Sequence, residues 1–342
     1  MILDVKKSPS IRRPGFLLAV LALAVSTAGA AGRPKQAPVV QNAPGGSAVF
    51  WSDPPDWAGR DLFYGPGGKA HEPHGPFTFV KEDLNGTNPK FVVRDPNGVK
   101  WKVKLGLEAR PETVVTRLVW AAGYYANEDY FVPDMRIAGM PAHLHRGQKL
   151  VGPGGEVRNV RLKREDEKKI GIWQWDKVAF AGSREWNGLR VLMALVNNWD
   201  LKDENNSVYR DGSQRIYMVS DLGASFGSAG RTWPRNRAKD NLNSYSHSKF
   251  IRRIGPDTVD FQVPARPMFV YLVNPKEYLS RVHLERLGRN VPRADAKWLG
   301  QILARLSPTQ IHDAFRAAGY SPEEIQAFSR LLEERITALT DL

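Results

Sequence analysis

The sequence predicts an α+β fold with two lobes, strands first and helices after them. Three segments rich in β-branched and aromatic residues, at 77–80, 91–93 and 99–105, are separated by turn sequences, which predicts an N-terminal antiparallel sheet. One amphipathic helix follows, and apolar residues then recur mostly at helical spacing. We expect a strand-rich lobe over residues 61–165 and a helical lobe with a helical tail over residues 166–342.

The first thirty residues have the pattern of a secretory signal peptide. Four basic residues precede a ten-residue apolar run, residues 16–25, and Ala28 and Ala30 supply the small side chains of a cleavage site after Ala30. A membrane anchor is the alternative, but the run covers about half of the roughly twenty residues that a span needs. We therefore expect residues 1–30 to be removed and the mature protein to be exported, periplasmic or secreted, with no membrane span.

Composition narrows the classes of partner. The sequence has no cysteine, so it cannot form a disulfide framework or carry a lipoprotein anchor. Its formal charge is +13, and residues 1–30 hold four basic residues and one acidic residue, so their removal would leave +10. A basic surface favours anionic partners such as phosphate groups. The basic residues are dispersed, which also fits an ordinary solvated surface, and no nucleic-acid module is recognisable.

Each segment of the remaining chain has a predicted role. Residues 31–60 are rich in Pro, Gly and Ala and predict a linker or N-terminal arm, whose second half carries Trp51 and Trp57 and is expected to pack on the fold. The first helix begins near Pro111 and ends near Gly123. Further strands are expected at 130–132, 135–137, 157–162 and 216–219, a long helix at 184–197, and three tail helices within 294–342.

Two acidic motifs occur in the order that a metal site would need. Asp200 and Asn205 lie five positions apart after the long predicted helix, and Asp221 opens an Asp-Leu-Gly after a short apolar strand. Crowded carboxylates in a partly buried loop repel one another unless a cation is present. The same five-residue separation occurs at Asp83 and Asn88, but there it lies in an ordinary turn. Only the pair Asp200 and Asn205 is followed by Asp221, so only this pair indicates a site.

A lysine and a glutamate complete the pattern. Lys104 ends the third strand on the same face as Lys100 and Lys102, and Glu112 opens the following helix, where a carboxylate is favoured by the helix dipole. The alternative interpretation is that the three lysines simply face solvent and that Glu112 is an ordinary carboxylate at a helix start. Lys102 is the substitute if Lys104 is not the functional lysine.

Residues 77–225 resemble the atypical protein and lipid kinase-like superfamily, in which a Lys-x-Gly ends the strand as Lys104-Leu105-Gly106 does here. The resemblance implies a two-lobed kinase-like fold that binds ATP or another nucleotide with Mg or Mn. It implies that Lys104 binds phosphates and is oriented by Glu112, with Lys102 and Lys90 as further cofactor-binding residues. It further implies that Asp200 accepts the acceptor's hydroxyl proton and that Asn205 and Asp221 hold metal.

The sequence departs from this pattern in two places. No Gly-rich loop lies between the first two strands, where residues 85–90 stand instead, and no His-Arg precedes Asp200. The sequence around Asp200 and at residues 182–185 is also similar to uncharacterised exported bacterial proteins. We expect an exported phosphotransferase that moves a nucleotide phosphate to a hydroxyl acceptor. The alternative is a catalytically inactive kinase-like module that binds an envelope component.

Other motifs in the sequence give weaker indications of a functional site. Ser225 lies in a Gly-x-Ser-x-Gly sequence, but a nucleophile elbow needs a strand leading into the serine and a helix after it. The pairs His71 with His74 and His143 with His145 have possible metal spacing yet lie in Pro- and Gly-rich loops. The tryptophans would suit carbohydrate binding, but we expect those near predicted helices and strands to be packed in the core.

Overall fold

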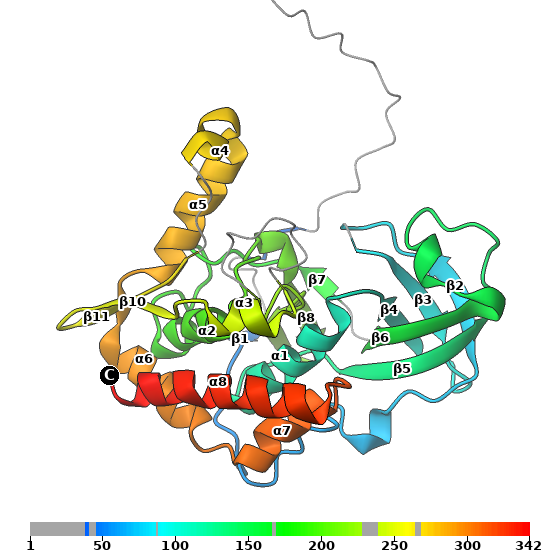
Figure 1. The fold of residues 1–342 in the computed structure, drawn as a ribbon, viewed down its shortest axis with the longest axis horizontal. Coiled ribbons are helices and arrows are strands. Elements are labelled where there is room, and N and C mark those ends of the chain that lie inside the picture. Colours follow the sequence, from blue (N-terminus) through cyan, green and yellow to red (C-terminus); the bar gives the residue numbers. More distant parts are fainter. Residues whose placement is uncertain (1–37, 41–45, 87, 166–168, 228–238, 264–267) are drawn as a thin grey trace, which may run out of the picture. The chain divides into compact units, whose positions relative to one another are not determined.

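The computed structural model describes residues 38–40, 46–86, 88–165, 169–227, 239–263 and 268–342, all within the compact unit Gln36–Leu342. The predicted signal peptide lies outside the described residues. Strands predominate in the first half of this unit and helices in the second, which confirms the α+β class (Figure 1). The elements are β1 Ser47–Val49, β2 Phe77–Glu82, β3 Lys90–Arg94, β4 Lys100–Lys104, α1 Ala109–Ala121, β5 Asp129–Ala138, β6 Glu156–Arg164, β7 Lys169–Gly171, α2 Arg184–Leu195, β8 Asn206–Asp211, β9 Gln214–Val219, α3 Leu242–Ser246, β10 Ile251–Ile254, β11 Thr258–Phe261, α4 Met268–Val273, α5 Pro275–Gly288, β12 Val291–Pro292, α6 Arg293–Leu303, α7 Pro308–Arg316 and α8 Pro322–Thr340.

The predicted meander is part of a closed barrel with the strand order β2-β3-β4-β6-β5. Its pairs are antiparallel except β2 with β5, where Phe77 is the parallel partner of Ile137. Two strands expected at residues 130–132 and 135–137 form the single strand β5. Trp101 and Val103 of β4 are buried in the barrel core, so the alternation of the strand turns its lysines to the outer face.

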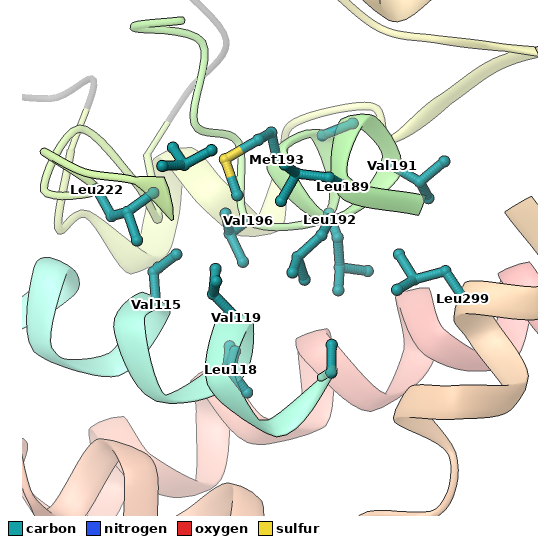
Figure 2. Close-up of a cluster of buried hydrophobic side chains, with 14 of the residues drawn as sticks. Val115, Leu118, Val119, Leu189, Val191, Leu192, Met193, Val196, Leu222 and Leu299 are labelled. Carbon is teal, nitrogen blue, oxygen red and sulfur yellow. The ribbon is translucent and has the colours of Figure 1, made fainter. Parts of the chain in front are cut away.

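Helix α1 joins the barrel to the helical part of the fold. It contacts β5 and β6 on one side and α7 on another, and almost all of its residues are buried. Figure 2 shows Val115 and Val119 of α1 facing Leu192 of α2 and Val196, the residue after α2, in one apolar cluster. Burial of each such side chain contributes about 1.5–3 kcal/mol. Packing on both faces therefore fixes α1, which carries Glu112.

A second sheet, with the order β1-β9-β8-β7, lies in the part of the chain expected to be helical. Strands β8 and β9 form a hairpin in which Asn206 pairs with Val219. The N-terminal arm contributes β1, which runs parallel to β9, and the Trp51 indole donates a hydrogen bond of 2.8 Å to the carbonyl of Ala122. The arm thus packs on the fold. A further small sheet has the order β10-β11-β12.

The three predicted tail helices are present as α6, α7 and α8. Helices α7 and α8 begin with capping boxes at Ser307 and Ser321, each followed by a proline. Arg335 of α8 is buried and donates to the carbonyl of Leu195 at 2.8 Å, which ties α8 to the end of α2. No helix among the described residues is long and apolar enough to cross a membrane.

Candidate functional site

Lys104 lies at the end of β4, on the outer face of the barrel, and its side chain is only 2% exposed. Its Nζ forms ion pairs with Glu112 at 2.7 Å and with Glu108 at 3.0 Å, and it donates a hydrogen bond to Asp221. Burial lowers the pKa of Lys104, but the three carboxylates outweigh it and raise the pKa well above its usual value. Lys104 is therefore a permanently charged centre shared by three acidic residues.

Glu112 lies in the first turn of α1 and is held from two sides. Its second partner is Arg161 of β6, whose guanidinium donates at 2.7 Å, and Arg161 is the register partner of Lys104. All three side chains are almost fully buried. The Nε and one terminal nitrogen of Arg161 make no hydrogen bond within the described residues. These two nitrogens of Arg161 can therefore donate further hydrogen bonds, which no described residue accepts.

Glu108 was missed by the sequence reasoning. It is the residue before α1, and its carboxylate accepts from Lys104, from Asn88 and from Lys239. Burial raises the pKa of Glu108, but Lys104 chiefly outweighs it, so the pKa is lowered. The available signal was spacing, because Glu108 lies four residues after Lys104 and four before Glu112.

Asp221 follows β9 and has a left-handed backbone with φ of 59°, a conformation that aspartate adopts more readily than most residues. Burial raises the pKa of Asp221, but the charge and hydrogen bond of Lys104 lower it to about 2. Its side chain is 37% exposed. Gly223 of the same Asp-Leu-Gly has no room for a side chain, since a Cβ there would lie 2.5 Å from the Cβ of Glu108.

The β8–β9 hairpin brings Asn205 beside Ser220, the residue before Asp221. The backbone N–H of Ser220 donates to the carbonyl of Asn205 at 2.8 Å. The Asn205 amide nitrogen donates to the backbone carbonyl of Asp200 at 2.7 Å, whereas its Oδ1 accepts no hydrogen bond from any residue that the structure describes. Asn205 is therefore held by its backbone and its amide nitrogen, and its Oδ1 is not used by the described part of the chain.

Asp200 lies near this hairpin end and pairs with Lys202 at 2.6 Å, with about a third of its side chain exposed. Burial lowers the pKa of Lys202, but Asp200, and more weakly Asp221, raise it. Lys202 therefore lies in the field of both aspartates, and it is a second residue that the sequence reasoning did not select. Across the described ranges, no three His, Cys, Asp or Glu side chains gather as around a metal ion.

The two other predicted lysines differ. Lys90 of β3 is the register partner of Lys104 and has no carboxylate within ion-pair distance among the described residues. Burial lowers its pKa against the opposing fields of Asp83 and Asp221. Lys102 is paired with Asp83 at 3.1 Å and Glu165 at 2.7 Å. Lys90 is thus the less neutralised of the two.

The remaining motifs are structural. Ser225 is fully buried and donates to the carbonyl of Leu222 at 2.7 Å, so it is not an exposed nucleophile. His71 pairs with Glu128, and His145 with Glu82, on the surface. Trp173 and Trp175 are buried in the core, as expected. The side chain of Asp83 accepts from the N–H of Asn85, the ordinary turn role predicted for it.

Comparison with known proteins finds no matching family model and no matching curated protein. Among solved structures, the chain is similar to the proinflammatory kinase CtkA of Helicobacter pylori, with 12% identity, 77% of this chain and 96% of that chain covered, and a TM-score of 0.43. It is also similar to two structures of the Golgi casein kinase, one with Mn and ADP bound, at 11% and 10% identity. Each of these two matches covers 78% of this chain and 73% of the Golgi casein kinase chain, and the TM-scores are 0.36 and 0.33. At these identities and TM-scores, the likenesses concern the fold alone.

Proposed function

We propose that the protein is an exported, kinase-like phosphotransferase that uses a nucleotide and a divalent metal to phosphorylate a hydroxyl acceptor. The observation that carries the proposal is the buried Lys104, which pairs at once with Glu112 of α1 and with Asp221 after β9. These residues come from three separate parts of the chain. A permanently charged lysine held in this way suits the binding of phosphate groups.

The residues fit a metal that arrives together with a nucleotide. Asp221 supplies a carboxylate with a lowered pKa, and Asn205, whose backbone pairs with Ser220, supplies an Oδ1 that no described residue uses. Mg²⁺ commonly takes one or two carboxylates and completes its shell with phosphates and water. When bound, the ion would neutralise phosphate charge and help to orient the phosphates.

Each remaining residue has a role in this proposal. Glu112, anchored by Arg161, holds Lys104 in position. Lys90 and Lys102 line the same outer face of the barrel and add positive charge for the phosphates. Asp200, partly exposed and paired with Lys202, accepts the proton of the attacking hydroxyl.

One observation favours a second candidate, a catalytically inactive binding module for an envelope component. Three carboxylates already surround Lys104, so the lysine is neutralised without a nucleotide. Such a protein would retain the fold and the charged cluster but would not transfer phosphate. The two candidates therefore differ in binding and in turnover, which separate experiments can measure.

Nucleotide binding tests the first requirement. The purified mature chain is heated with Mn²⁺ and ADP, and a ligand at a hundred times its Kd should raise the unfolding free energy by about 2.7 kcal/mol. Asp221→Ala should lose the metal-dependent part of the shift. Asp313→Ala, which removes a partly exposed aspartate of α7, is the matched control and should behave like the parent. No shift in the parent removes the nucleotide from the proposal.

Turnover separates the kinase from the binding module. Asp200→Asn should keep ADP affinity close to the parent's and lower phosphate transfer from ATP by about 100-fold or more, since a general base contributes that much. Self-phosphorylation and ATP hydrolysis are the readouts while the acceptor is unidentified. A parent that binds Mn²⁺ and ADP but transfers phosphate no faster than Asp200→Asn supports the binding module.

A further inference from the structure

Glu108 is the acidic residue of the cluster that the proposed reaction does not use. We propose that its carboxylate holds the place of a nucleotide phosphate, and that Lys239 and Asn88, which bind it now, are phosphate-binding residues of the loaded protein. The inference rests on the proposed function, which it deepens. It assigns phosphate-binding residues to a protein whose sequence has no Gly-rich loop between its first two predicted strands.

The first ground is the set of donors that converge on this one carboxylate. One oxygen accepts from Lys104, at 3.0 Å, and from Asn88, and the other accepts from Lys239. The three donors come from the β2–β3 turn, the end of β4 and the segment that precedes α3. Two ammonium groups and an amide, gathered around an anion that is 8% exposed, form an anion-binding site. In this structure the bound anion is the carboxylate of Glu108 itself.

The second ground is charge. A nucleotide phosphate that approached Lys104 would meet three carboxylates, and this repulsion falls only if one of them withdraws. Glu112 is anchored by Arg161, and Asp221 is the proposed metal ligand. Glu108 has no comparable anchor, because its partners are the donors that a phosphate would use. In this proposal, Glu108 is therefore the carboxylate that turns away from Lys104 when a phosphate binds.

The third ground is that Glu108 can release its partners without loss of the helix. Glu108 occupies the N-cap position of α1, but its side chain caps no backbone N–H there. Its backbone carbonyl accepts from the N–H of Glu112 at 3.1 Å, which begins the helix. Gly223 packs directly against its backbone and Cβ. The main chain is thus held in place while the carboxylate remains free to turn away.

The test measures binding of three probes to the full mature chain by calorimetry: ADP with Mn²⁺, adenosine, and inorganic tripolyphosphate. Glu108→Gln keeps the shape and removes the competing charge, so ADP and tripolyphosphate should each bind at least about threefold more tightly, while adenosine binding is unchanged. Glu334→Gln, on the exposed face of α8, is the matched control and should match the parent for all three probes.

Lys239→Ala should weaken ADP binding both in the parent and in the Glu108→Gln background. The second comparison matters because a lysine that acted only on Glu108 would have no effect once that charge is gone. Asn88→Ala should act in the same direction with a smaller loss. If Glu108→Gln does not fold, Glu108→Asp, whose shorter side chain reaches the donors less well, should give an intermediate gain in phosphate affinity.

The outcomes separate this inference from the proposed function. If ADP binds the parent but Glu108→Gln, or Glu108→Asp in its place, binds ADP no more tightly, the placeholder role is wrong and the proposed function stands. If tripolyphosphate binding depends on Glu108 but ADP does not bind, the anion site is supported and the nucleotide is removed from the proposal. An equal gain for adenosine would overturn the inference, since the effect would not concern phosphate.

Discussion

Two buried cations lie close to helix α1, and they differ in how their charge is matched. Arg117 of α1 pairs with Asp129 of β5 at 3.2 Å and also donates to the backbone carbonyls of Phe63 and Thr113. The second oxygen of Asp129 accepts from Thr116 at 2.9 Å. One cation and one carboxylate therefore satisfy each other within a fully buried network, which is the arrangement expected of a structural pair.

The cluster around Lys104 is not balanced in this way. Three carboxylates surround the lysine, one of them is more than a third exposed, and two nitrogens of the neighbouring Arg161 have no partner among the described residues. Burying several charges together carries a desolvation penalty that ion pairs and hydrogen bonds must offset. The comparison teaches that the two buried cations differ not in burial but in their partners: the Lys104 cluster has a partly exposed carboxylate and two Arg161 nitrogens that no described residue uses.

The largest expected effect is on stability at the balanced pair. Arg117→Ala leaves Asp129 buried without its cation and should lower the free energy of unfolding by about 3–5 kcal/mol. Denaturant unfolding followed by circular dichroism measures this loss. The protein that remains folded should bind Mn²⁺ and ADP with an affinity close to the parent's. A loss below about 1 kcal/mol would show that the pair is not the structural one.

Lys104→Met should give the opposite pattern. Affinity for ADP should fall by at least about tenfold, or about 1.4 kcal/mol, because the phosphates lose their buried cation. Unfolding should be affected less than by Arg117→Ala, since Glu112 keeps Arg161 and Glu108 keeps Lys239. Calorimetry and denaturant unfolding of the same preparation check both parts. Equal ADP affinity in variant and parent would contradict the assigned role.

The two regions should also respond to pH with opposite signs. Burial raises the pKa of Asp129 to about 6 against the opposing charge of Arg117, so its contribution to stability is full below its unfolded value near 3.8 and is lost as the pH rises through 6. The pKa of Asp221 is lowered to about 2, so its contribution is present above about 4 and is lost as the pH falls toward 2.

Unfolding of the parent, Asp129→Asn and Asp221→Asn across this range measures each contribution as a difference. The parent should gain stability relative to Asp129→Asn on acidification from pH 7 to 4. Below pH 4, it should lose stability relative to Asp221→Asn. Differences of the same sign in both variants would contradict the distinction between the regions.

The smallest effect concerns neither region directly. Ser321→Ala removes the N-cap of α8 and should lower the free energy of unfolding by about 1 kcal/mol. ADP affinity should stay unchanged, because the change weakens only the scaffold. A fall in affinity that exceeds the loss expected from partial unfolding would show that α8 communicates with the Lys104 cluster.

Much of the cluster could be predicted because its parts are marked by local sequence. Lys104 ends an alternating strand, Glu112 opens a helix, and Asp221 follows a short apolar strand, so each position can be read from its neighbours. The structure brings Lys104, Glu112 and Asp221 together. It places Asn205 beside the backbone of Ser220, while the described residues show no hydrogen bond between the side chains of Asp200 and Asp221.

The missed features depend on contacts between distant segments. Lys239 reaches Glu108 from 131 positions away, which no local pattern can indicate. The barrel closes through a parallel contact between β2 and β5, and β1 exists as a strand because β9 is beside it. Backbone pairing of this kind depends on where a partner strand lies, so it is weakly encoded in a short segment.

The central claim is that the Lys104 cluster binds nucleotide phosphates with a metal. The most direct measurement is a crystal structure of the protein with Mn²⁺ and ADP. The account predicts a phosphate oxygen bound to the Nζ of Lys104, with the metal on Asp221 and Asn205. Nucleotide bound elsewhere, with Lys104 still holding all three carboxylates and no metal on Asp221, would contradict it.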